Sequence, residues 1–367
     1  MIIGGLVGGG RTREPLPLAP RPLPGEAISS WAARTAARYD LSATDLAARL
    51  PGSRAGGAGH WNMRWLDYRA DPGLEAALAA GAQVAPERLQ ALRVVLGDGS
   101  TSCWHRAGVA WCPACVHEDL ARWGETYEHA TWRLGCCVLC PDHGIRLNDQ
   151  CRRCLPASRA HFGHADGRMT LVCAQCARVL DPPKGEDTDA DDNRFLAFDL
   201  VATPGLTRTV GALQADLVAA LAGVAPDRPG DVLRSAGGLI DVVASLVAGI
   251  GLGRDMRFKH RVDWFATARG EAGTVAYELF TPADASVYWA FGMLGIAAAV
   301  LDSVNGHDEA GHRWKQDGVA PVITAASFMA WLNDTGRQWL RSASGHWEPP
   351  LRKAFWAAAE GRTGNWY

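Results

Sequence analysis

The chain has 367 residues, of which 48% are hydrophobic, so it is long enough to form two or three domains with separate cores. Its 37 basic and 39 acidic side chains give a formal net charge of −2, which excludes binding of nucleic acid through an overall positive charge. No apolar run reaches the length of a membrane span, and the opening residues Met1 to Val7 lack the features of a secretory signal. We therefore expect a cytoplasmic protein with no membrane partner, in which any DNA contact depends on a local patch.

The first 26 residues are rich in glycine and proline, and residues 15–25 alone contain five prolines. Proline lacks a backbone donor and clashes with the preceding helical turn, so this stretch predicts an extended arm. Stiff polyproline-like segments lose little entropy when they dock in a groove. We therefore expect Leu16, Leu18 and Leu23 to contact a partner protein. The alternative is that these leucines fold back on their own domain.

Residues 27–101 predict a helical domain that resembles a helix-turn-helix unit. Ile28, Trp31, Thr35 and Tyr39 recur at three- and four-residue steps, which predicts a first helix. Ser42 then caps a second helix, with Asp45 three residues on as its capping-box partner. Further helices are expected over residues 61–68, 74–80 and 86–96.

Two short helices joined by a tight turn are a weak signal, because many such pairs are only pieces of a helical bundle. If this pair binds double-stranded DNA, its contacts are made by the basic residues on or beside the two helices. These candidates are Arg34, Arg38, Arg49 and, in the following loop, Arg54.

All ten cysteines lie between Cys103 and Cys176, and most of them form Cys-x-x-Cys pairs. A two-residue gap lets both sulfurs of a tight turn reach one ion, and two such turns complete a tetrahedron. Clusters of this kind in a reducing compartment indicate metal rather than disulfides. The spacing predicts two zinc sites, the first formed by Cys112, Cys115, Cys140 and His143 and the second by Cys151, Cys154, Cys173 and Cys176.

The first site has a competing ligand set, because Cys137 also forms a Cys-x-x-Cys pair with Cys140. We prefer His143 as the fourth ligand, since Pro141 and Gly144 predict a tight knuckle around it. In this interpretation residues 134–139 are a strand that leads into the knuckle, and Cys136 and Cys137 are small packing residues on its two faces. The four-thiolate alternative stays open at this point.

Saturated four-ligand sites are structural, because a catalytic zinc keeps an open position. The signatures of a metalloprotease helix, a phosphate-binding loop and a nucleophile elbow are all missing from the sequence. We therefore expect two structural zinc ions and no enzymatic activity. A metalloenzyme remains the less favoured alternative.

The expected fold class is mainly α with small zinc-bound β elements: a helix-turn-helix-like domain, a tandem zinc-finger or ribbon region and a helical C-terminal domain. In the last of these, helices are expected over 233–249 and 283–301, and a third is capped by Thr324 with one stripe of Phe328, Trp331, Leu332, Thr335 and Trp339. The predicted boundaries are an arm at 1–26, the helical domain at 27–101, the zinc region at 102–182, an acidic linker at 183–193 and the C-terminal domain at 194–367.

Several of these motifs together resemble the TniQ and TnsD family of transposon target-selection proteins. A proline-rich lead runs into Gly25-Glu26, a serine pair and Trp31. Cys112 and Cys115 follow with the acidic pair Glu118 and Asp119, and then an aromatic-rich stretch with Tyr127 and Trp132. A Cys-Pro-x-His-Gly knuckle at 140–144 and the pair Cys151 and Cys154 complete the ordered likeness, which covers residues 15–180.

This resemblance implies a role in transposition that spacing alone cannot show. Family members link a target to an AAA+ ATPase regulator of the TnsC or TniB type, which recruits the transposase. Some bind a DNA attachment site directly, and others dock on a CRISPR Cascade complex, often as a homodimer. The resemblance also implies structural zinc sites and a helix-turn-helix region. A zinc-dependent transcription regulator, which would need no ATPase, is the alternative from another class.

Overall fold

In the computed structural model, the chain forms two compact units. The first comprises residues 1–94, 122–131 and 162–171, and the second comprises 95–121, 132–161 and 172–367. The residues that the structure describes are 15–50, 66–68, 71–94, 104–106, 108–151, 154, 160–165, 168–180, 204–225, 235–252, 286–305 and 323–361.

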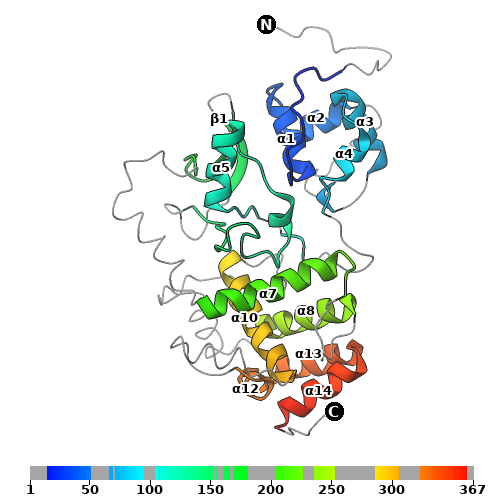
Figure 1. Ribbon diagram of the computed structural model, residues 1–367, viewed down its shortest axis with the longest axis vertical. Coiled ribbons are helices and arrows are strands. Elements are labelled where there is room, and N and C mark those ends of the chain that lie inside the picture. Colours follow the sequence, from blue (N-terminus) through cyan, green and yellow to red (C-terminus); the bar gives the residue numbers. More distant parts are fainter. Residues whose placement is uncertain are drawn as a thin grey trace. The chain divides into compact units, whose positions relative to one another are not determined.

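The helices of the first unit that lie in its described residues are labelled in Figure 1: α1 (Ile28–Ala37), α2 (Ala43–Arg49), α3 (Pro72–Ala82) and α4 (Pro86–Gln90). The predicted helical period holds, because Ile28 and Trp31 of α1 are fully buried in the core of this unit. Leu74 and Leu78 of α3 pack into the same core. Burying apolar side chains of this size contributes about 1.5–3 kcal/mol each, so the stripe that defines α1 also holds it in place.

The turn between α1 and α2 follows the predicted cap. Ser42 Oγ accepts the backbone N–H of Asp45 at 3.1 Å, which satisfies a free donor at the start of α2. The Asp45 carboxylate accepts the Ser42 hydroxyl at 2.7 Å. The helix expected over 61–68 falls largely outside the described residues, of which 66–68 form a short helical turn, and α4 ends at Gln90, earlier than predicted.

The second unit contains α5 (Pro113–Trp123) up to Ala121, and a group of carboxyl-terminal helices. These helices are α7 (Pro204–Leu221), α8 (Ala236–Leu252), α10 (Val287–Val304), α12 (Ala325–Trp331), α13 (Asp334–Ala343) and α14 (Pro349–Ala359). Helices α7, α8 and α10 pack on one another (Figure 1). Gly295 on α10 allows this approach, because a Cβ there would lie 3.1 Å from Cδ1 of Leu206 on α7. The expectation of a mainly α fold is therefore confirmed.

The single helix predicted after Thr324 is wrong, because two helices occupy that segment. Thr324 caps α12, as the sequence indicated, and it forms a capping box with Ser327. The Asn333 side chain then accepts the backbone N–H of Gly336 at 2.8 Å and starts α13. Because of this break, residues before and after Asn333 no longer share one apolar face. Phe328 is buried, whereas Trp339 is 41% exposed.

The β structure among the described residues is a two-stranded hairpin of β1 (Ala160–Ala165) and β2 (Arg168–Cys173), with isolated bridges elsewhere. The strand predicted over 134–139 is wrong. Leu134 and Leu139 each form one bridge, to His105 and Arg146, and a turn lies between them. None of the helices in the described ranges combines the length and apolar character that a membrane span requires.

Candidate metal centres

The first cluster is built from the start of one helix and from one turn. Cys112 precedes α5 and Cys115 lies in its first turn, where the Cys112 carbonyl accepts the Val116 N–H at 3.0 Å. Cys140 and His143 belong to the turn at 140–144. One ligand atom from each of these four residues lies within 4.8 Å of every other, so the structure brings together the set that the sequence spacing singled out.

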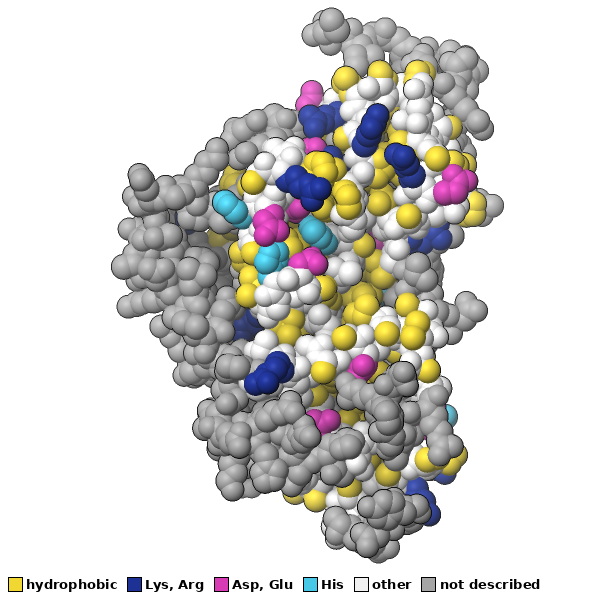
Figure 2. All heavy atoms as spheres, viewed as in Figure 1, with side chains coloured by type: hydrophobic (Ala, Val, Ile, Leu, Met, Phe, Trp, Pro, Cys, Tyr) yellow, Lys and Arg dark blue, Asp and Glu magenta, His cyan; other side chains and the backbone are white. Residues whose placement is uncertain are grey.

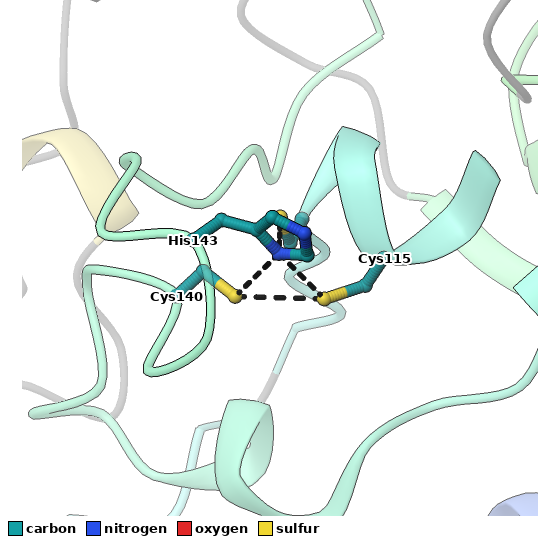
Figure 3. A group of neighbouring side chains, drawn as sticks. Cys115, Cys140 and His143 are labelled. Carbon is teal, nitrogen blue, oxygen red and sulfur yellow. Dashed lines mark hydrogen bonds between the residues drawn. The ribbon is translucent and has the colours of Figure 1, made fainter. Parts of the chain in front are cut away.

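The separations within this cluster fit a tetrahedral ion. The sulfurs of Cys115 and Cys140 are 3.5 Å apart. Nδ1 of His143 lies 3.6, 3.2 and 3.5 Å from the sulfurs of Cys112, Cys115 and Cys140, and Figure 3 shows the ring directed into this group. Zinc bonds of about 2.3 Å to sulfur and about 2.0–2.1 Å to nitrogen give tetrahedral edges of roughly 3.5–3.8 Å. The donor set and the separations can therefore accommodate a zinc ion.

The thiols of this cluster also favour a cation. Contacts with the Cys112 and Cys140 thiols and burial raise the pKa of Cys115. Hydrogen bonds from Cys112 and Cys115 lower the pKa of Cys140. Three adjacent sulfurs therefore resist ionising together without a positive charge between them, which is the charge that a bound divalent metal supplies.

The backbone of the turn explains its glycine. Gly144 has φ of +65°, a left-handed conformation that costs other residues about 1–2 kcal/mol. The Gly144 N–H donates to the Cys140 carbonyl at 2.8 Å, and the Cys140 N–H donates to Ile145 at 2.8 Å. These bonds close the knuckle and present Cys140 and His143 to the same point.

The competing ligand Cys137 lies outside this group. Its side chain is fully buried, and its thiol donates to the Leu139 carbonyl at 3.4 Å. Burial raises its pKa, which disfavours the thiolate that a metal requires. Cys136 is also fully buried. The geometry therefore favours the set with His143 over the set of four thiolates.

Two side chains hold the segment that leads into the knuckle. Gln214 on α7 accepts the backbone N–H groups of Val138 and Leu139 at 2.8 and 2.9 Å, and its amide donates to the Leu139 carbonyl at 2.9 Å. Arg106 is buried and donates to four main-chain carbonyls, at Trp132, Leu134, Gly135 and Cys137. Neither residue could be predicted from the sequence, because a lone Gln or Arg has no spacing that identifies such a role.

The second cluster flanks the β hairpin. Cys151 and Cys154 precede β1, Cys173 ends β2, and Cys176 lies in the turn that follows. The four sulfurs lie within 4.8 Å of one another, and those of Cys151 and Cys176 are 3.9 Å apart. A set of four thiolates matches structural zinc sites and leaves no position for a substrate.

The predicted DNA-contact residues have different surroundings. Arg34 is 3% exposed and binds the carboxylates of Glu26 and Glu125 at 2.8 and 2.5 Å, so the geometry does not support a phosphate contact there. Arg38 is 38% exposed and pairs with Glu125 at 3.2 Å. Arg49 is exposed in the last turn of α2, and Arg54 lies outside the described residues.

On the face drawn in Figure 2, the coloured basic side chains lie singly among apolar and acidic ones and form no continuous patch over the described residues. The described residues on this face therefore do not offer the broad positive surface that drives strong non-specific DNA binding.

The described part of the arm, residues 15–26, folds back on its own unit, which corrects the expectation that all three leucines face a partner. The Leu16 side chain packs against the helical core beside Gly81 of α3. Leu23 is 9% exposed, whereas Leu18 is 58% exposed and remains the candidate for a partner contact. The indole of Trp31 donates to the Pro20 carbonyl at 2.8 Å and fixes the arm further.

Residues 17–147 match the TniQ family. This part of the chain is a TniQ domain. The match contains all four residues of the first cluster and ends before Cys151, the first residue of the second. The TniQ domain associates the protein with transposition, in a family that is not catalytic and that works with protein partners and DNA. A comparison with curated proteins gave no match.

The opening motif of the TniQ domain, Gly25-Glu26 and the serine pair, forms hydrogen bonds inside the unit. Gly25 has φ of +71°, and the buried Glu26 carboxylate accepts the Leu23 N–H at 3.0 Å. Ser29 donates to Asp67 through its N–H and its hydroxyl, at 2.8 and 2.7 Å. Ser30 Oγ accepts the Glu128 N–H at 3.0 Å. The glycine, the acid and the serine pair therefore shape the unit from within and do not form a surface site.

Proposed function

We propose that the protein is a transposition adaptor, stabilised by two structural zinc ions, that links a DNA target to an AAA+ transposition regulator of the TnsC or TniB type. The TniQ domain over residues 17–147 is the observation that carries this proposal. The target is either double-stranded DNA itself or a complex already bound to it, such as CRISPR Cascade. The family's dimeric members make a homodimer the expected form on such a complex.

The zinc ions have a structural role in this proposal. Cys112, Cys115, Cys140 and His143 hold one ion, and Cys151, Cys154, Cys173 and Cys176 hold the other. Structural zinc sites supply about 10–16 kcal/mol of apparent binding free energy in small fingers. That contribution stabilises chain segments rich in turns, in which Cys140 and His143 depend on two short backbone bonds for their positions.

An association assay tests the adaptor role. The purified full-length chain is immobilised and mixed with an AAA+ transposition regulator of the TnsC or TniB type, with ATP and with or without duplex DNA. We expect the regulator to be retained and its retention to increase with target DNA. A chain that binds one duplex sequence specifically and never retains the regulator would be a zinc-dependent transcription regulator instead. Binding to neither partner would remove both functions.

A further inference from the structure

His143 is held at both ring nitrogens. Its Nδ1 faces the three sulfurs, and its Nε2 lies 3.0 Å from Oε1 of Glu118. Glu118 and Cys115 are one turn apart on α5, so they share a face of that helix. One short helix therefore carries both the sulfur on one side of the imidazole and the carboxylate on the other.

An imidazole can offer either nitrogen to a metal, and the partner of the second nitrogen decides which one. A carboxylate that accepts the Nε2–H fixes the ring orientation and leaves the Nδ1 lone pair for the ion. The knuckle backbone fixes the Cα of His143 but not its ring, because rotation about the Cα–Cβ and Cβ–Cγ bonds can turn Nδ1 away from the three sulfurs. The Glu118 side chain is 66% exposed and that of His143 only 23%, so the carboxylate approaches from the solvent side.

We propose that Glu118 is a positioning residue of the first metal centre, which holds His143 as the Nε2–H tautomer so that Nδ1 binds the ion. This inference rests on the proposed zinc site. The role explains an exposed acid beside the ligand pair, a position that neither core packing nor helix capping requires. Outer-sphere partners of this kind contribute about ten- to hundredfold to metal affinity.

The test uses the full-length chain and measures zinc affinity by competition with a chromophoric chelator. In this titration, the zinc-binding step that disappears in His143→Ala is assigned to the first site. We expect Glu118→Ala to weaken zinc binding at this site about ten- to hundredfold, and Glu118→Gln to stay within a few fold of wild type because its amide oxygen still accepts the bond. Glu87→Ala, which removes an exposed acid from α4, is the charge-matched control and should leave the affinity unchanged.

Nitrogen-15 spectra of histidine-labelled, zinc-loaded protein give a second measurement that folding stability alone would not change. Wild type and Glu118→Gln should show His143 with a proton on Nε2, and Glu118→Ala should show a mixed population. Unchanged affinity and tautomer in Glu118→Ala would overturn the proposal. Equal weakening of zinc binding in Glu118→Gln and Glu118→Ala would also overturn the proposal, because the charge of Glu118 would then determine the affinity and not the orientation of the His143 ring. If the wild-type protein binds no zinc, the result would instead contradict the proposed function, which includes two structural zinc ions.

Discussion

Gln214 and Leu139 exchange a pair of hydrogen bonds at 2.9 Å across 75 residues of sequence, which fastens α7 to the segment before the metal knuckle. Gln214 is 6% exposed and also accepts the Val138 N–H. One side chain therefore satisfies three buried backbone groups.

Replacing Gln214 with Leu keeps a side chain of broadly similar size and removes all three bonds. Each backbone group left buried without a partner costs about 1–3 kcal/mol, so we expect Gln214→Leu to lower the free energy of unfolding by at least about 2 kcal/mol. Chemical denaturation followed by tryptophan fluorescence measures this change. Gln338→Leu on the exposed face of α13 is the matched control, and an equal effect of both variants would contradict the role of Gln214.

The two ligand hypotheses for the first centre predict opposite outcomes for two variants. With His143 as the ligand, His143→Ala should lose one zinc ion per chain, whereas Cys137→Ala should keep both ions and lose only packing. Elemental analysis of freshly purified protein distinguishes them. Cys154→Ser should independently lose the other ion, and one ion or none in wild type would exclude two zinc sites.

Short-range patterns in the sequence predicted the candidate metal ligands and most helices, because both depend on neighbouring residues. Cys112 directly precedes the helical turn that carries Cys115, and Cys140 and His143 belong to one tight turn. The helix break at Asn333 was harder to predict, since the apolar period continues past it and only the side-chain bond to Gly336 starts a new helix.

The surroundings of Arg34 could not be predicted from local sequence. Its second carboxylate partner, Glu125, is 91 residues away, and nothing near Arg34 distinguishes it from an exposed arginine on a helix. The arm presents the same difficulty, because Leu16 packs on a helix whose Gly81 lies far along the chain. Both depend on tertiary packing, which periodicity does not encode.

The glycine of the knuckle gives a prediction about backbone conformation. Gly144→Ala places a side chain at φ of +65° but meets no atom within 4 Å, so the cost is conformational alone. We expect a loss of about 1–2 kcal/mol in the free energy of unfolding. Gly108→Ala is the control, because its Cβ is equally unobstructed and its φ lies outside the left-handed range. Thermal melts of the zinc-loaded proteins should therefore give Gly144→Ala a clearly lower melting temperature than Gly108→Ala.

Glu26 gives a prediction about pH. Burial raises its pKa from an ordinary 4.5 to about 7, against the opposing effect of Arg34. A raised pKa means that the folded state holds this proton more tightly than the unfolded state. The resulting stabilisation is fully present below pH 4.5 and is lost as the pH rises towards 7.

The free energy of unfolding of wild type, relative to Glu26→Gln, should therefore decrease between pH 4.5 and 7. Denaturation of both proteins across this range measures the difference, and metal release affects the two alike. A difference that increases with pH would show that the ion pair with Arg34 outweighs burial.

The arm leucines should separate into a structural and a surface residue. Leu16 packs against the core, and its N–H bonds to the Gly81 carbonyl, so Leu16→Ala should lower the free energy of unfolding by about 1–2 kcal/mol, less than a fully buried leucine would cost. Leu18 is 58% exposed, so Leu18→Ala should leave stability within about 0.5 kcal/mol of wild type. The matched pair therefore distinguishes folding from partner binding. If Leu18→Ala weakens retention of the AAA+ regulator while its melting temperature is unchanged, the arm contributes to that interface. If retention is unchanged as well, the regulator must bind another surface, and the arm serves only to hold the amino-terminal unit together through Leu16, Leu23 and Trp31.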